Sequence, residues 1–275
     1  MTSRVAWAVA AALWSCAAVG TDSNPPAVSP AAEAEHIRKL IESPDLETRR
    51  RGCKMLNMSG ITSPALFDYL EKQIEARYLK ARDDPRHVKE VGSLVEALAT
   101  SGDPKRAAIL NKIADADDED VNRRLRRVAI RAVKMLDRYQ AWNPIIDKPA
   151  PKHDKVFWQV RRVMNMTESG DRELQHGGVD RAVGLRDTHP EVFDALSKQL
   201  ASLVVDGDVD AKDDELASLL VIALGKSGQP KYRAQLEQIA DNTRSHRLGS
   251  KADAALRRLE QWVPEDEPDP GEKPD

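Results

Sequence analysis

Residues 62–74 read TSPALFDYLEKQI, and residues 188–200 read THPEVFDALSKQL. The two stretches are 126 positions apart. The same offset places LVEALATSGDPK at 94–105 onto LVIALGKSGQPK at 220–231 without a gap. Repetition at a fixed period is typical of proteins built as arrays of similar units. The sequence therefore predicts an internal duplication of about 126 residues.

Each copy reads as a set of amphipathic helices joined by short turns. Ser63 and Pro64 form a helix start signal, and the apolar residues after them recur every three or four positions. Each copy therefore predicts about six helices, or three antiparallel pairs of roughly 40 residues. A single pair cannot cover both of its apolar faces, so successive pairs stack. The predicted fold is an all-α solenoid of about six antiparallel helix pairs.

The composition agrees with helices and limits the partners. The chain has 275 residues, of which 32% are charged and 4% are aromatic, so a large aromatic core is excluded. The formal net charge is −3, and the segment 263–275 contributes −5 through six acids and one lysine. The remaining body is only mildly basic, which is too weak a bias to predict nucleic-acid binding.

The first 20 residues form a secretory signal peptide. Arg4 precedes a short apolar run that ends at Leu13, and this run is too short to span a membrane. Residues 13–16, LWSC, resemble the bacterial lipoprotein box, which implies that Cys16 carries a lipid; cleavage after Gly20 is the alternative. We expect an exported protein of a Gram-negative bacterium, in the periplasm or anchored in the inner leaflet of the outer membrane.

These signals give the expected boundaries. They are a signal peptide at 1–20, a flexible Pro/Ser/Ala linker at 21–34, a first three-pair half at 35–144, a connector at 145–153, a second three-pair half at 154–262 and an acidic disordered tail at 263–275. Both halves end alike, with QAWNP at 140–144 and EQWVP at 260–264.

Two segments carry a family resemblance. Residues 97–136, ALATSGDPKRAAILNKIADADDEDVNRRLRRVAIRAVKML, and residues 224–259, LGKSGQPKYRAQLEQIADNTRSHRLGSKADAALRRL, resemble HEAT repeats. Each has a turn of the form S-G-x-P-K, and an Arg-bearing second helix follows it. The resemblance extends over roughly Ala34 to Trp262 and implies a HEAT-like solenoid, without implying an activity.

No catalytic, cofactor or metal site is expected. Some HEAT-repeat enzymes bind iron through adjacent His-Glu pairs, and no such pair occurs here. The loop DGDVDAKDDE starts like a calcium loop at Asp206, but Ala211 and Ala217 replace its glycine and its last glutamate. No phosphate-binding glycine loop or nucleophile motif is present. Cys53 lies in an apolar helical pattern and is expected to be a buried small residue.

Arginines in the second helices of the pairs form the candidate binding groove. In a HEAT-like stack these helices line the concave face, where the arginines would attract an acidic peptide, an anionic polymer or lipid headgroups. Two alternatives stay open: a ladder of intramolecular Asp–Arg pairs, or occupation of the groove by the acidic tail. The candidates are Arg49, Arg50, Arg51, Arg123, Arg124, Arg127, Arg131, Arg257 and Arg258.

Three functions are compatible with these observations. The main expectation is a non-enzymatic scaffold that holds other envelope proteins together and contacts the membrane through the lipid on Cys16. The others are a binding module for an anionic ligand in the arginine groove and an enzyme subunit with an unrecognised site. Trp142 and Trp262, in matching positions at the ends of the two halves, are expected to be packing residues.

Overall fold

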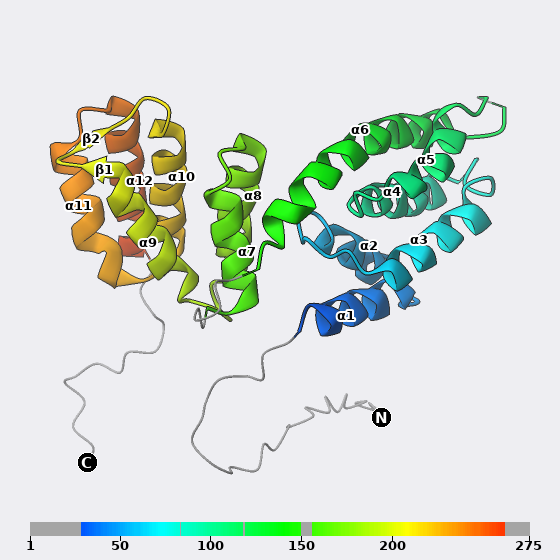
Figure 1. Ribbon diagram of the computed structural model, residues 1–275, viewed down its shortest axis with the longest axis horizontal. Helices are drawn as coiled ribbons and strands as arrows, with labels where there is room; N and C mark the ends of the chain where they lie inside the picture. The colour runs from blue at the N-terminus through cyan, green and yellow to red at the C-terminus, as the bar shows by residue number, and fades with distance from the viewer. Residues whose placement is uncertain (1–28, 83, 118, 150–155, 262–275) are drawn as a thin grey trace, which may run out of the picture.

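The computed structural model describes residues 29–82, 84–117, 119–149 and 156–261. Within these residues the protein is all-α, which confirms the predicted class (Figure 1). Cys16, Trp262 and the acidic tail lie outside the described residues. No helix in the described ranges is both long and apolar enough to cross a membrane.

The described helices form two consecutive sets of six. The first set is α1 (Pro30–Glu42), α2 (Leu46–Met55), α3 (Pro64–Arg77), α4 (Pro85–Ala99), α5 (Ala107–Ala114) and α6 (Arg123–Ile146). The second set is α7 (Trp158–Thr167), α8 (Arg172–Gly184), α9 (Val192–Leu203), α10 (Asp214–Lys226), α11 (Arg233–Asn242) and α12 (His246–Gln261). Short 3-10 helices η1 (Pro104–Arg106) and η2 (Pro230–Tyr232) precede α5 and α11.

Each helix packs against the next one of its pair, as in α1 with α2 and α7 with α8. The second helices also pack against one another, in the series α2, α4, α6 and in the series α8, α10, α12. The two sets lie end to end, with α7 and α8 in the middle (Figure 1). The apolar side chains gather in two large clusters, one in each set.

A third, smaller cluster lies where the two sets meet. Tyr139, Trp142 and Ile146 of α6 contact Met166 of α7 and Leu174 of α8. Trp142 is buried, and its indole Nε1 donates a hydrogen bond to Asp171 Oδ2 over 3.1 Å.

The ends of the predicted first half need correction. The linker was expected to extend to residue 34, but α1 begins at Pro30, because the Ser29 hydroxyl caps the helix by accepting from Ala32 N. The half was expected to end at residue 144, but α6 continues through Pro144 to Ile146. A proline lacks one backbone donor, and in a last turn this loss does not stop the helix.

The loop considered for calcium begins within a short β-hairpin. Val204–Val205 (β1) pairs with Asp208–Val209 (β2) in an antiparallel hairpin. Asp206 and Gly207, both with positive φ, form its two-residue turn, which is the geometry that Asp-Gly favours. In the described residues no group of three or more His, Cys, Asp or Glu is placed to hold a metal ion.

Candidate functional site

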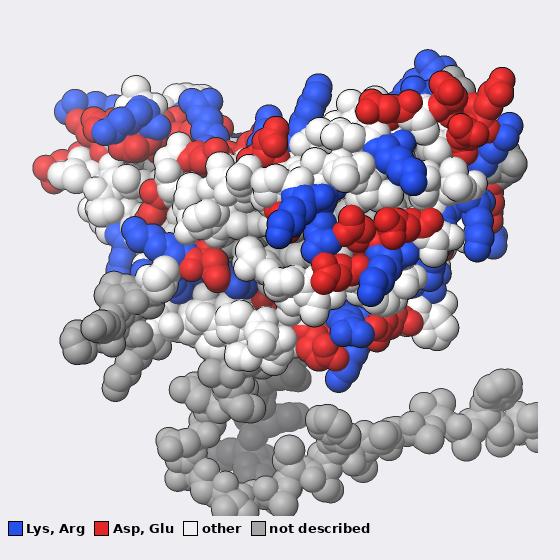
Figure 2. Space-filling model, turned by 45° about the vertical axis from the view of Figure 1, so that its right-hand side comes forward, with Lys and Arg blue, Asp and Glu red and all other residues white. Residues whose placement is uncertain are grey.

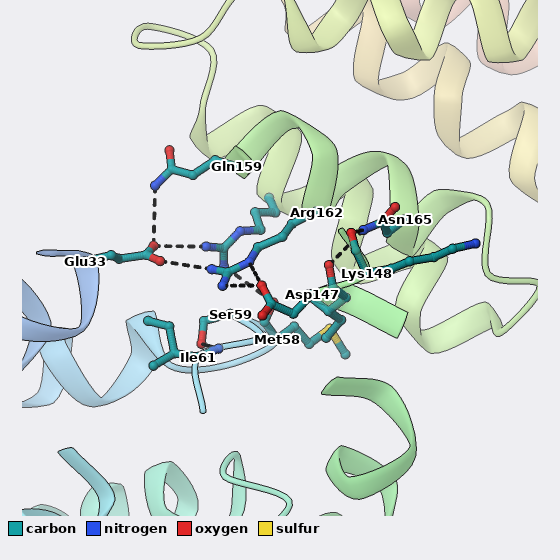
Figure 3. Close-up of polar contacts among 11 residues, drawn as sticks. Glu33, Met58, Ser59, Ile61, Asp147, Lys148, Gln159, Arg162 and Asn165 are labelled. Atoms are coloured by element: carbon teal, nitrogen blue, oxygen red, sulfur yellow. Dashed lines mark hydrogen bonds and ion pairs between the residues drawn. The ribbon is translucent and has the colours of Figure 1, made fainter. Parts of the chain in front are cut away.

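A cluster of charged side chains, of which Glu33 and Arg162 are buried, joins the two sets of helices (Figure 3). Glu33, in the first turn of α1, contacts two arginines of the second set. Its Oε2 accepts from Arg162 Nη1 over 3.1 Å, and its Oε1 lies 3.3 Å from Arg181 Nη2. Arg162 also donates to Asp147 Oδ1 over 2.7 Å and 3.0 Å. We call Glu33, Asp147, Arg162 and Arg181 the junction cluster.

The burial of Glu33 and Arg162 makes their pairing obligatory. Relative exposure is 7% for Glu33 and 3% for Arg162. A charge removed from water costs several kcal/mol unless an opposite charge and hydrogen bonds compensate it. Two carboxylates face two guanidinium groups here, so the cluster is neutral as a whole. Gln159 Nε2 adds a hydrogen bond to Glu33 Oε1 at 3.4 Å.

Local structure positions the cluster. Asp147 is the C-cap residue of α6, and Asn165 of α7 completes this helix end. The Asn165 amide donates to the carbonyl oxygens of Ile146, over 3.0 Å, and of Lys148, over 2.9 Å. These carbonyls would otherwise lack partners, as is usual at a helix C-terminus. The end of α6 is therefore fixed to α7, next to Arg162.

A groove lies beside the junction cluster. Its volume is about 2470 Å³, and its walls come from α1, α2, α7, α8 and α9. Phe157 stacks on His189, with ring centroids 4.0 Å apart, and Trp158 holds the Arg162 guanidinium 4.5 Å from its ring centre. Carboxylates outnumber Lys and Arg in the lining.

A second pocket of about 770 Å³ adjoins the groove, because both are lined by Glu33, Met55 and Gln159. It lies between α2 and α8. Lys54, Arg172 and Arg181 contribute positive charge to its wall, and Glu33, Glu173 and Asp180 contribute an equal number of negative charges. We call it the α2–α8 pocket.

The exposed face of α6 carries the other notable feature. Five exposed cations, from Arg124 to Arg138, recur along it at spacings of three or four residues, so they lie on one side of the helix, and Arg123 adjoins the first of them. Arg131 lies 3.5 Å from Glu96 of α4, and Arg138 donates to Glu173 Oε1 over 2.6 Å. The α6 basic face consists of Arg123, Arg124, Arg127, Arg131, Lys134 and Arg138.

The structure separates the nine arginines named from the sequence. Of these, Arg51 lines the groove; four lie on the α6 basic face and two on α12. Arg49 contacts Glu90 over 2.9 Å, and Arg50 contacts Glu47 over 2.8 Å. Positive and negative side chains also interleave on the face that Figure 2 presents. Arg49 thus pairs with an acid of a neighbouring helix and Arg50 with an acid of its own helix. The ladder of Asp–Arg pairs stays a prediction.

Sequence reasoning missed Lys134 and Arg138 of the α6 basic face, although their helical spacing from Arg127 and Arg131 was visible. It also missed Glu33, Arg162 and Arg181, for which no signal exists, because residues 129 to 148 positions apart meet only in the folded chain.

Two other predicted roles are settled by burial. Cys53 is buried, and burial raises the pKa of its thiol to about 12, with Glu90 contributing in the same direction. It is therefore a packing residue, as expected. Trp142 is buried in the cluster between the two sets, which agrees with its predicted packing role.

Comparison with known proteins gives one structural likeness. No family model and no curated protein matches this chain. A solved structure of human deoxyhypusine hydroxylase in complex with glycerol is similar, with 16% sequence identity and a TM-score of 0.28, covering 84% of this chain and 97% of that chain. At this TM-score the likeness carries no argument about a reaction of this chain.

The main functional expectation is nevertheless corrected. The protein was expected to be a scaffold without enzymatic activity, whereas the similar structure is that of an enzyme. The scaffold followed from the predicted solenoid and the signal peptide, and the absence of an activity followed from the lack of a recognisable motif. Both are therefore withdrawn.

Proposed function

We propose that the protein is a binding module for an extended anionic ligand, which lies along the α6 basic face. The observation that carries this proposal is the alignment of six exposed cations on one side of a single helix. From Arg123 to Arg138 the face extends for about 22 Å, at 1.5 Å per residue. A linear anion of several charges matches that length.

The α6 basic face is only partly neutralised. Glu96 and Glu173 on neighbouring helices each take one of its cations. In the part of the chain that the structure describes, Arg127 and Lys134 have no acidic side chain within ion-pair distance. Unpaired cations in a row raise the local positive potential and attract an anion, more strongly at low salt.

The neighbouring helix α4 also carries an exposed cation. This helix lies beside α6, because a Cβ at Gly92 would be 3.8 Å from the nearest methyl group of Val128. Lys89, one turn before Gly92, is exposed as well. The positive region ends near the N-terminus of α6, because Glu119 and Asp120 are exposed in the acidic loop before this helix.

The test uses the double variant Arg127→Gln/Lys134→Gln. Fluorescence anisotropy with labelled polyglutamate and labelled polyphosphate distinguishes an acidic polypeptide from a phosphate polymer, and sedimentation with anionic vesicles tests lipid headgroups. We expect weaker binding, with the slope of log affinity against log salt reduced by about one for each cation removed.

The matched control is Lys39→Gln/Lys72→Gln, which removes two exposed cations from α1 and α3 and changes the net charge equally. It should bind like the unmodified chain. Equal affinities of the two double variants at every salt concentration would reject the α6 basic face as the binding surface.

For the fold we further propose a HEAT-like solenoid of stacked helix pairs that arose by internal duplication. Two buried glycines 126 positions apart support this. A Cβ at Gly52 would lie 2.9 Å from Leu40 Cβ, and a Cβ at Gly178 would lie 3.0 Å from Met166 Cβ. Leu40 and Met166 are also 126 positions apart, so equivalent residues make the same close helix crossing in both sets.

Export and lipid attachment at Cys16 are proposed on the sequence alone. The apolar run after Arg4 and the LWSC segment support them. A lipid on Cys16 would tether the folded chain to a membrane surface through the Pro/Ser/Ala segment that precedes α1.

A further inference from the structure

The α2–α8 pocket lies where the α6 basic face ends. Arg138, the last cation of that face, donates to Glu173 on the pocket wall over 2.6 Å. The wall also carries Lys54 from α2 and Arg172 and Arg181 from α8, together with the carboxylates of Glu33 and Asp180. Arg172 is paired with Glu215 at 3.2 Å, which leaves Lys54 and Arg181 as the cations available to a ligand. A chain that lies along α6 in this direction meets the pocket next.

Several N–H donors of the Arg181 guanidinium have weak hydrogen bonds or none within the described residues. Its side chain is 17% exposed. Nη2 is 3.3 Å from Glu33 Oε1, Nη1 is 3.5 Å from the Met58 carbonyl oxygen, and Nε is buried without a hydrogen-bond partner in the described residues. Arg162 is held more tightly, by two carboxylates at 2.7 to 3.1 Å. A guanidinium has five N–H donors, so Arg181 is the under-coordinated member of the junction cluster.

The electrostatic balance agrees with the geometry. Burial lowers the pKa of Arg181, Glu33 opposes this effect, and Arg162 adds to it. The charged form of Arg181 is thus less stable here than in water, because burial outweighs the attraction of Glu33, which also contacts Arg162. A bound anion beside Arg181 would stabilise its positive charge further.

We propose that the α2–α8 pocket is an anion-binding site in which Arg181 binds one carboxylate or phosphate group, with Lys54 as the second cation. A planar guanidinium matches the oxygen spacing of both groups. That this group belongs to an extended ligand rests on the proposed function of the α6 basic face; the pocket itself requires only the single anionic group.

The experiment is calorimetric titration of the full chain with inorganic phosphate and, separately, with acetate. We expect one site for the preferred anion, and the preference identifies a phosphate or a carboxylate ligand. Arg181→Gln should weaken binding about tenfold or more, because a charge-assisted contact to a buried group is lost. The control Arg186→Gln removes a cation five residues away on the same chain segment and should change affinity by less than about twofold.

Glu33→Gln provides a second, opposite readout. It removes the carboxylate that competes for Arg181, so the anion should bind more tightly although the fold is less stable. A merely structural role of Arg181 would not produce tighter binding. Lys54→Gln, at an exposed position, should weaken binding by about threefold without affecting folding.

Absence of binding to the unmodified chain would overturn the proposal, as would Arg181→Gln with unchanged affinity. If Arg181→Gln does not fold, unchanged affinity of Lys54→Gln overturns the proposal instead. The experiment separates this proposal from the proposed function of the α6 basic face. The variant Arg127→Gln/Lys134→Gln should leave phosphate binding in the α2–α8 pocket intact. Retained phosphate binding together with unaltered polyanion binding of that variant would reject the proposed function alone.

Discussion

Replacement of Glu33 by Gln tests how the two sets of helices are held together. The carboxylate accepts from Arg162 over 3.1 Å, from Arg181 over 3.3 Å and from Gln159 over 3.4 Å, at 7% exposure. Gln keeps the size and one acceptor but removes the charge. Arg162 and Arg181 are then left with Asp147 as the remaining carboxylate of the junction cluster.

Breaking a buried ion pair by removing one partner typically costs about 3–5 kcal/mol. The lower end applies here, because Asp147 still contacts Arg162 over 2.7 Å and its own side chain is 49% exposed. We therefore expect Glu33→Gln to lower the free energy of unfolding by about 3 kcal/mol.

Urea denaturation followed by far-ultraviolet circular dichroism measures this change. The matched control is Glu35→Gln, an exposed glutamate in the same helix, which should change stability by less than about 0.5 kcal/mol. A loss below about 1 kcal/mol for Glu33→Gln, or equal losses in the two variants, would refute the reasoning that the junction cluster is an obligatory contact. A double-mutant cycle with Arg162→Gln should show strong coupling.

Three further predictions concern packing, reactivity and location. Gly52→Ala should lower the free energy of unfolding by about 1–3 kcal/mol, because the new Cβ would lie 2.8 Å from Ile41 Cγ1. Gly184→Ala is the control: a Cβ there has nothing within 4 Å, so the change should be neutral or slightly stabilising. Thermal denaturation compares the two variants. Cys53 should resist alkylation at pH 8 until urea unfolds the chain, because burial raises the pKa of its thiol to about 12; rapid labelling of the folded protein would contradict this. Cys16→Ala should move the protein from the membrane fraction to the soluble fraction, as detected by fractionation, and a variant that stays in the membrane fraction would exclude the lipid anchor.

Local patterns were sufficient for the helices. Ser63-Pro64 predicted the start of α3, and the structure has this helix beginning at Pro64. A helix start depends on a few neighbouring residues, so it is visible in sequence. The end of α6 was misjudged, because its last turn is stabilised from elsewhere: the Asn143 amide donates to the carbonyl oxygens of Thr100 and Ser101.

The sequence by itself determined the all-α class, the burial of Cys53 and the presence of arginines on α6, since each depends on residue type and helical spacing. Only the tertiary structure decided which charges meet. It placed Glu33 of α1 against Arg162 and Arg181 of the second set, and it paired Arg49 and Arg50 with acids. The reason is physical: charge compensation acts over a few ångströms in space, and separation along the chain does not limit it.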